Sequence, residues 1–341
     1  MKTSDFDYDL PREFIAQTPV EPRDSSRLLV LQRDSGRMEH SRFSDLGNYL
    51  KPGDLLVLNR TRVIPARLFA RKDTGGRVEI LLLRRQDLLT WECLVGGKGL
   101  SQGKVVFVEN GPEAEVVSVL EGYRRMVRFK EPIEPFFPKI GHVPLPPYIH
   151  EKLTDPERYQ TVYARDPGSA AAPTAGLHFT PHLLDQLEAQ GVGITYVTLH
   201  VGLDTFAPVT EEDPTSHQIH SEWCELSSGT ADAVNLTHQK GGRVIAVGTT
   251  SVRTLESASQ PSTQQNSAHV IPFEGDTRLY IYPGYNFRMV DGMITNFHLP
   301  RSTLLMLVSA FAGREHILDA YEVAKREKYR FYSFGDAMLI I

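Results

Sequence analysis

The alternation of apolar and polar positions divides the chain into stretches that predict different secondary structure. Near the N-terminus, the segments "SRLLVLQRDSGRMEH" and "LKPGDLLVLNRTRVIPARL" each combine an apolar run with a turn rich in Gly, Asp or Pro, a pattern typical of β-strands. From residue 67 to 129, short runs such as "GGRVEILLLRR", "GKVVFV" and "AEVVSVL" are separated by glycine turns. Regular short strands of this kind predict a small closed β-barrel.

After Tyr163 the pattern changes to helical periods that alternate with buried strands. Thr180 and Pro181 are typical of the first positions of a helix, Leu183 and Leu187 share one face, and Gly191 ends it. The segment "GGRVIAVGTTSVRTLESAS" predicts a strand, a tight loop and a helix. Further along, "STLLMLVSAFAG" and "EHILDAYEVAKREK" each have the period of a helix, the first capped by a serine.

The proline-rich segment "EPIEPFFPKIGHVPLPPYI" follows the barrel pattern and indicates a connector that returns to another body. The expected fold class is therefore an α+β multidomain protein. Residues 1–65 and 150–341 form a main mixed α/β domain, and residues 66–149 form a smaller inserted antiparallel β-barrel domain.

Composition narrows the class of protein. A hydrophobic content of 41% and a charged content of 23% are those of a globular protein. We expect no signal peptide and no membrane span, because no apolar run is long enough. The cysteines, Cys93 and Cys224, form no C-x-x-C pair, which indicates a cytoplasmic protein without a disulfide framework or a zinc knuckle.

The formal net charge of −5 argues against nucleic acid as a partner, but the charge is unevenly distributed. Between Arg60 and Lys104 there are ten Lys and Arg against four Asp and Glu, and "YRRMVRFK" adds a second basic run. A local basic face can bind phosphates whatever the total charge, since salt screens charges beyond about 10 Å. The alternative interpretation of these basic residues is that they only form the solvated faces of strands.

Two of the polar clusters at expected strand ends are centred on single histidines. In "AAAPTAGLHFT", small residues would let backbone N–H groups approach a ligand that also meets Thr174, His178 and Phe179. The alternative for this stretch is a tightly packed turn with a hydrogen-bonded histidine. In "TLHVG", His200 lies inside an apolar run, where a buried imidazole needs a partner.

The segment "HQIHSEW" brings His217, His220 and Glu222 close together in sequence. On a helix, Glu222 would point away from the two histidines, and on a strand His217 would point away from the other two. Because neither geometry gathers three ligands, we expect no metal. A metal-dependent hydrolase built on this segment is still the alternative enzyme.

The remaining clusters follow strands near the C-terminus. In "AVGTTSVRTLE", a strand leads into Thr249, Thr250 and Arg253 at the start of a helix, where free N–H groups suit a carboxylate or phosphate. "ITNFHLPRST" supplies Asn296 and His298, and "YIYPGYNF" brings tyrosines together. The chain has no G-x-x-x-x-G-K-[ST], G-x-S-x-G or H-E-x-x-H motif, which disfavours ordinary NTPases, α/β-hydrolases and zincins.

Taken together, ordered segments resemble one family along the whole chain. They include "FIAQTPVEPRDSSRLLVL", "AAPTAGLHFT", "TLHVG", "GGRVIAVGTTSVRTLE", "YIYPGYNF", "ITNFHLPRSTLLMLVSAFAG" and "YRFYSFGDAML". The chain is similar to the S-adenosylmethionine:tRNA ribosyltransferase-isomerases of queuosine biosynthesis. It departs from the family pattern at Asp204, where the family usually has glycine, and a side chain there affects the contacts of that loop.

The resemblance implies an enzyme that transfers and isomerises the ribosyl part of S-adenosylmethionine. The acceptor would be 7-aminomethyl-7-deazaguanine at the wobble position of a tRNA anticodon stem-loop. The products would be epoxyqueuosine-tRNA, adenine and methionine. No metal and no cofactor beyond this co-substrate are implied, and we expect a monomer.

Residue chemistry can be fitted to this reaction. A sulfonium acidifies the adjacent C5′ protons, so a histidine or carboxylate base could start the reaction. The candidates for catalysis are His178, His200, His217, His220, Glu222 and His298. The candidates for binding S-adenosylmethionine or the base are Thr174, Phe179, Thr249, Thr250, Arg253, Tyr282 and Asn296.

The basic strands would then hold the tRNA. The candidates are Arg60, Arg62, Arg67, Arg71, Lys72, Arg84 and Arg85. The alternative from another functional class is a non-catalytic RNA-binding module. Such a module would not explain the polar residues at the strand ends of the larger domain.

Overall fold

A computed structural model describes residues 1–151, 153–202, 208–261 and 268–341. The chain divides into two compact units. The larger one comprises residues 1–61, 147–166 and 172–341, and the smaller one comprises residues 62–146 and 167–171. The expected fold class is confirmed, because a mixed sheet with helices and a closed antiparallel barrel are both present.

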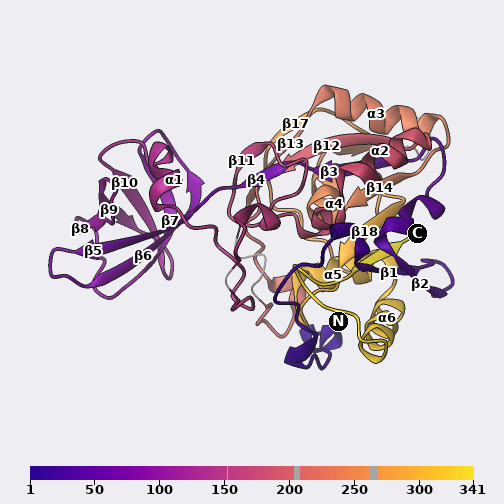
Figure 1. The fold of residues 1–341 in the computed structure, drawn as a ribbon, viewed down its shortest axis with the longest axis horizontal. Coiled ribbons are helices and arrows are strands. Elements are labelled where there is room, and N and C mark those ends of the chain that lie inside the picture. Colours follow the sequence, from indigo (N-terminus) through magenta and orange to yellow (C-terminus); the bar gives the residue numbers. More distant parts are fainter. Residues whose placement is uncertain (152, 203–207, 262–267) are drawn as a thin grey trace. The chain divides into compact units, whose positions relative to one another are not determined.

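The larger unit is built on a nine-stranded mixed sheet (Figure 1). Its strands are β1 (Arg27–Leu31), β2 (Met38–Arg42), β3 (Leu55–Asn59), β12 (Gly193–Leu199), β13 (Glu222–Leu226), β14 (Val244–Val247), β17 (Phe273–Thr277), β18 (Gly292–Asn296) and β19 (Ala337–Ile340). Their order is β17-β13-β12-β3-β14-β18-β19-β1-β2. In the middle, β12, β3, β14 and β18 run parallel, so their carboxyl ends lie at one edge of the sheet.

Helices α2 to α6 accompany this sheet. Their bounds are α2 Pro181–Ala189, α3 Ser228–Gln239, α4 Gly248–Ser257, α5 Thr303–Ala312 and α6 Arg314–Arg326. The expected caps are confirmed: the Thr180 hydroxyl accepts the Leu183 N–H at 3.1 Å, and the Ser302 hydroxyl accepts the Leu305 N–H at 3.1 Å. A short two-stranded sheet pairs β15 (Ser259–Pro261) with β16 (Ala268–Val270).

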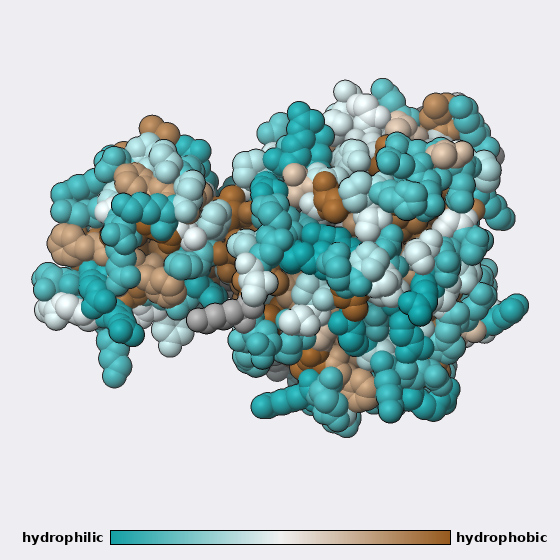
Figure 2. All heavy atoms as spheres, in the orientation of Figure 1, coloured by the Kyte–Doolittle hydropathy of each residue, from teal (hydrophilic) through white to brown (hydrophobic). Residues whose placement is uncertain are grey.

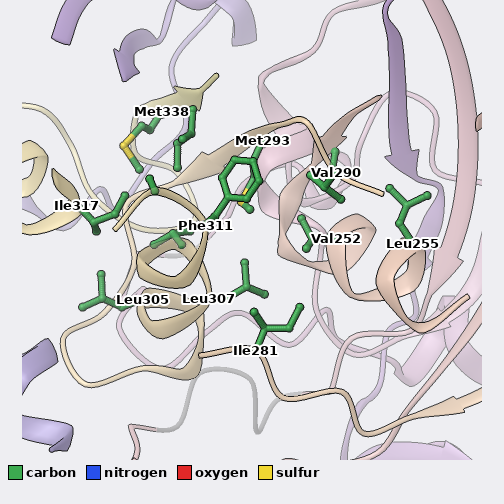
Figure 3. Packing of buried hydrophobic residues seen from close by; sticks show 14 of the residues in the cluster. Val252, Leu255, Ile281, Val290, Met293, Leu305, Leu307, Phe311, Ile317 and Met338 are labelled. Carbon is green, nitrogen blue, oxygen red and sulfur yellow. The ribbon is translucent and has the colours of Figure 1, made fainter. Parts of the chain in front are cut away.

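The central strands are buried on both faces, which explains their unbroken apolar runs. In β3, Leu55 and Val57 pack into one hydrophobic cluster, whereas Leu56 and Leu58 pack into another on the opposite face. The first cluster includes residues of α3, α4, α5 and α6, and the second includes residues of α2. Figure 3 shows part of the first cluster, with Phe311 of α5 beside a residue of β18, Met293.

The smaller unit is a closed six-stranded barrel with the order β10-β7-β6-β5-β8-β9. The bounds are β5 Arg67–Lys72, β6 Arg77–Arg85, β7 Thr90–Gly96, β8 Val105–Val108, β9 Glu113–Val119 and β10 Arg124–Phe129, followed by the short α1 Phe137–Ile140. Side chains alternate, so in β5 Leu68 and Ala70 are buried while Phe69 and Arg71 are exposed. The strands β4 (Thr61–Val63) and β11 (Asp166–Ser169) form a separate pair.

Among the helices of the described ranges, none is both long and apolar enough to cross a bilayer.

One turn of the larger unit depends on a glycine. The turn Thr174–His178 is a 3₁₀ helix, and a Cβ at Gly176 would lie 2.1 Å from the Tyr163 hydroxyl and 2.9 Å from Thr161 Cγ2. Thr161 is buried, and the hydroxyl of the partly buried Tyr163 is itself enclosed, so both neighbours have little room to move.

We therefore expect Gly176→Ala to lower the free energy of unfolding by about 1–3 kcal/mol through overpacking. The matched control is Gly229→Ala in α3, where a Cβ would meet no atom within 4 Å. The control should leave stability unchanged or raise it by up to about 1 kcal/mol. Urea unfolding midpoints measure both effects, and equal midpoints for the two variants would contradict the expected close contact at Gly176.

Candidate functional site

A pocket opens in the larger unit at the carboxyl ends of the parallel strands. Its lining residues follow β12, β14 and β18 or come from the loops packed against them: Tyr148, Ala172, Pro173, Thr174, Ala175, Val201, Gly248, Thr249, Thr250, Thr295, Asn296, Phe297, His298, Leu299, Ser302, Leu304, Tyr332 and Ser333. In open α/β sheets, this edge is where ligands bind. Five of the predicted site residues meet here: Thr174, Thr249, Thr250, Asn296 and His298.

The start of α4 supplies hydrogen-bond donors to the pocket. The helix begins at Gly248, and the preceding residue, Val247, has no side chain that can cap it. The first N–H groups of a helix lack partners within the helix and carry partial positive charge. Thr249 and Thr250 are both more than nine-tenths buried, and the Thr250 hydroxyl has no hydrogen-bond partner in the described chain. The arrangement suits an anionic or strongly polar ligand group.

His298 lies half-buried in the pocket wall. Its backbone is held on both sides: its N–H donates to the Tyr321 hydroxyl at 2.8 Å, and its carbonyl accepts from the Tyr8 hydroxyl. Nε2 pairs with the Thr295 hydroxyl at 2.7 Å, whereas Nδ1 has no partner within the described ranges. Burial lowers the pKa of the imidazole, so the ring is neutral near pH 7 and Nδ1 can accept a proton when Nε2 carries the ring hydrogen.

His178 lies behind the pocket rather than in its lining. It is 4% exposed, stacks on Phe43 at a centroid distance of 5.0 Å, and uses both ring nitrogens. Nδ1 pairs with the Ser26 hydroxyl at 2.8 Å, and Nε2 lies 3.2 Å from Asn296 Nδ2. Burial and the nearby Arg330 and Arg23 lower the pKa of this imidazole to about 3. The alternative that the sequence left open, a packed turn with a hydrogen-bonded histidine, therefore describes its surroundings.

Phe179 and Tyr282, expected to stack on a base, are not among the lining residues in the described chain. Phe179 is fully buried and packs edge-to-face against Phe43, with 4.9 Å between the ring centroids, so its ring is part of the hydrophobic core. Tyr282 is half-buried and packs against Tyr280, with 5.1 Å between the ring centroids.

Arg253 and Glu222 form a buried ion pair, each side chain about 7% exposed. Glu222 also accepts the Gly202 N–H at 3.0 Å, and Arg253 Nε donates to the Leu279 carbonyl at 3.1 Å. Arg253 thus has a carboxylate partner from the protein itself and stands apart from the residues that line the pocket in the described chain. Glu222 is likewise occupied as the counter-charge of an arginine.

The other histidines lie in separate places. His200 is stacked on Trp223 at 5.0 Å and pairs with the Thr61 hydroxyl at 2.8 Å, and burial lowers its pKa. His217 pairs with Glu211 at 3.0 Å, and His220 is exposed. Within the described ranges, no three His, Cys, Asp or Glu side chains are grouped so that they could hold one metal ion.

The predicted tRNA-binding residues are mostly engaged with the protein's own groups. Ion pairs join Arg60 to Asp166 at 2.6 Å, Arg67 to Glu79 at 3.0 Å, Arg71 to Glu109 at 3.0 Å and Arg85 to Glu134 at 3.0 Å. Lys72 donates to the carbonyl of Lys98, and Arg62 and Arg84 lie in β4 and β6. Partly exposed ion pairs such as these each contribute about 0–1 kcal/mol to stability. Their arginines can therefore readily exchange the protein's carboxylates for other anions.

Sequence reasoning missed several residues of the site: Ser26, Tyr148, Thr295 and Tyr332. Ser26 and Tyr332 are far in sequence from the residues they contact, His178 and Asn296, and meet them only in the folded protein. Tyr332 carried one signal, its place three residues before a glycine in "YRFYSFGD", a turn-forming segment. In the structure it adopts φ 70°, a left-handed conformation that is costly for an aromatic residue. Asp204, the departure from the family pattern, lies outside the described residues.

Comparison with known proteins agrees with this architecture. The family model described as "Queuosine biosynthesis protein" matches residues 3–340. The S-adenosylmethionine:tRNA ribosyltransferase-isomerases of Carboxydothermus hydrogenoformans and Symbiobacterium thermophilum are 54% and 55% identical, each with both chains covered in full. The crystal structure of the S-adenosylmethionine tRNA ribosyltransferase of Thermotoga maritima is 40% identical with a TM-score of 0.57, covering 99% of this chain and 100% of that one.

Fold, pocket and relatives together define an enzyme of the transferase class, as the resemblance predicted. The chain belongs to the queuosine biosynthesis protein family.

The buried His178 makes acid stability testable. Its pKa is about 3 in the folded protein and about 6.5 when unfolded, so between these values the unfolded state binds one more proton. Stability is therefore complete above pH 6.5 and falls as the pH drops toward 3, by up to about 1.4 kcal/mol per pH unit for this residue.

We expect His178→Gln, which has no titrating group, to flatten this pH dependence, measured as the free energy of unfolding in urea from pH 7 to 4. The exposed His182→Gln is the matched control and should keep the wild-type slope. A slope that His178→Gln leaves unchanged would show that the folded protein accommodates the charged imidazole.

Proposed function

We propose that this enzyme transfers and isomerises the ribosyl moiety of S-adenosylmethionine onto 7-aminomethyl-7-deazaguanine at the wobble position of tRNA. The products are epoxyqueuosine-tRNA, adenine and methionine. The observation that carries the proposal is the pocket at the ends of β12, β14 and β18, in a chain that matches enzymes of this name over its full length. This pocket combines the uncapped start of helix α4 with the neutral side chain of His298.

The carboxylate of S-adenosylmethionine is assigned to the start of α4. The free N–H groups, the Thr249 hydroxyl and the unpartnered Thr250 hydroxyl offer donors to an anion. Arg253, also expected at this carboxylate, pairs through Nη1 with Glu222, its Nη2 has no hydrogen-bond partner in the described chain, and it is not among the residues that line the pocket. The assignment therefore relies on the helix and its threonines. The apolar and aromatic lining residues, including Tyr148, Tyr332 and Leu304, suit the nucleoside part.

His298 is assigned as the base that removes a C5′ proton. The sulfonium acidifies this carbon, and His298 lines the pocket with Nδ1 free of partners in the described chain, so its lone pair is available. The electron pair left on C5′ can form a C4′–C5′ double bond as the C4′–O4′ bond breaks, and the electron pair on O4′ then forms a carbonyl at C1′ as the C1′–N9 bond breaks and adenine departs with a proton. Thr295 fixes the ring through Nε2, as a partner on the second nitrogen generally does.

The barrel is assigned to tRNA binding. Residues 62–146 contain 14 Lys and Arg against 10 Asp and Glu, although the whole chain has 37 against 42. Hydrophobic side chains lie exposed among polar ones on the barrel (Figure 2), and they include Phe69 and Phe107. Phe69 shares the outer face of β5 with Arg71, which is paired in register with Phe107. Aromatic rings beside arginines are typical of surfaces that bind single-stranded RNA.

The proposed chemistry uses no metal and no cofactor beyond S-adenosylmethionine. Since the acceptor is a tRNA, the proposal places the enzyme in the cytoplasm, and the proposed unit of function is a monomer.

The experiment that tests the function uses tRNA carrying 7-aminomethyl-7-deazaguanine, incubated with the enzyme and S-adenosylmethionine. Mass spectrometry of the nucleosides and an assay of free adenine should give epoxyqueuosine and adenine in equal amounts. Binding of tRNA without turnover would favour the RNA-binding alternative. Hydrolysis that depends on an added divalent metal would favour the hydrolase alternative.

The role of His298 predicts that His298→Ala lowers kcat by about 10²–10⁴-fold while S-adenosylmethionine still binds. The control His182→Ala removes an exposed imidazole from α2 and should retain wild-type turnover. Single-turnover adenine release measures the chemical step, and a His298→Ala enzyme with the wild-type rate would exclude this residue as the base.

The ion pair between Arg71 and Glu109 gives a paired test of the tRNA surface. Arg71→Ala removes a positive charge and should weaken tRNA binding and lower the slope of log K against log salt by about 1. Glu109→Gln releases the same arginine and should leave binding equal or tighter. If both variants bind tRNA as the wild type does at every salt concentration, this face of the barrel does not contact tRNA.

A further inference from the structure

The orientation of the Asn296 amide is determined by its neighbours. Asn296 is 3% exposed and lies at the end of β18. Its Nδ2 is 3.1 Å from the Tyr332 carbonyl oxygen, a group that can only accept. The amide nitrogen must face that carbonyl, because a flipped amide would place Oδ1 against the carbonyl oxygen, and neither atom can donate a hydrogen bond.

The second hydrogen on Nδ2 is also used by the protein. It points to His178 Nε2 at 3.2 Å, so Nε2 is the acceptor and the ring hydrogen of His178 is on Nδ1. Nδ1–H then donates to the Ser26 hydroxyl at 2.8 Å. The low pKa of His178 keeps the ring neutral, which preserves Nε2 as an acceptor. Ser26, 1% exposed, and the stacked Phe43 hold the ring in place.

With both amide hydrogens taken, the carbonyl oxygen Oδ1 is what Asn296 can offer to a ligand. Its neighbour is the Thr174 hydroxyl at 3.4 Å, a pocket-lining group that donates to it. A carbonyl oxygen has two lone pairs, so one is left. A ligand atom that meets Asn296 must therefore be a donor, since an acceptor there would face an oxygen.

We propose that Asn296 is a specificity-determining residue that reads an N–H donor of the ligand, and that Ser26 and His178 are positioning residues for it. The inference rests on the proposed function for the identity of the ligand. S-adenosylmethionine carries two such donors, the exocyclic amino group of adenine and the α-ammonium group of its amino-acid part. Either one satisfies the chemistry, and analogues distinguish them.

The test is calorimetric binding to the full-length enzyme without tRNA. The probes are S-adenosylmethionine, its N6,N6-dimethyl analogue, which lacks the adenine N–H donors, and its desamino analogue, which lacks the α-ammonium. One analogue should bind about 5- to 150-fold more weakly than the parent, because it leaves the buried Oδ1 without a partner. The analogue that loses affinity identifies the donor.

Variants separate recognition by Asn296 from the bulk of the added methyl groups or the lost charge. In Asn296→Ala the penalty for that analogue should shrink to about 3-fold or less. If Asn296→Ala does not fold, the His178 variants carry the same test. His178→Gln retains an acceptor for Nδ2 and should retain the discrimination, whereas His178→Phe retains the stacking on Phe43 without an acceptor and should lose it.

The outcomes are distinct. If S-adenosylmethionine itself does not bind, the proposed function fails and the inference fails with it. If it binds and both analogues bind equally well, the proposed function stands and the inference is overturned. A penalty that persists undiminished in Asn296→Ala assigns the recognition to another residue and also overturns it.

Discussion

The structure depends on burying the central strands from both sides. β3, β14 and β18 place alternate residues into two hydrophobic clusters, so their backbone polar groups can be satisfied only by neighbouring strands. This constraint requires helices on both faces and leaves polar side chains only where strands end. The pocket lies at such ends, and several of its polar groups come from the last residues of β18 and from residues directly after β14 and β18.

Burial also divides the histidines by function. His178 and His298 are both neutral, but the first uses each nitrogen within the protein, whereas the second lines the pocket and has no partner for Nδ1 within the described ranges. The difference arises from the elements that carry them. His178 ends a tightly packed 3₁₀ turn against Phe43, whereas His298 follows β18 at the pocket wall. A buried imidazole of the first kind sets the geometry of its neighbours, and one of the second kind is available for proton transfer.

Much of the fold could be predicted from the sequence because local signals agree with the tertiary structure. The period-2 runs between 67 and 129, the cap at Thr180 and the cap at Ser302 are local, and each is present. The loops after β14 and β18 were also placed at the pocket, since strand ends meet at one edge. The partners of the charged residues could not be predicted in this way. Glu222 pairs with Arg253 across 31 positions, and no periodicity reports which charges meet in space. Ser26 contacts His178 across 152 positions for the same reason.

The place of the last strand has a consequence for synthesis of the protein. β19, residues Ala337–Ile340, lies between β18 and β1, so the first and last strands of the chain are neighbours in the sheet. During translation, β1 and β2 leave the ribosome about 300 residues before β19, at roughly 5–20 residues per second. The edge of β1 is without this neighbour for tens of seconds and the edge of β18 for a few seconds, and both edges are exposed to incorrect pairing in that time. The barrel, whose strands are consecutive in sequence, can close early, while the sheet that forms the pocket is completed only after β19 has been synthesised.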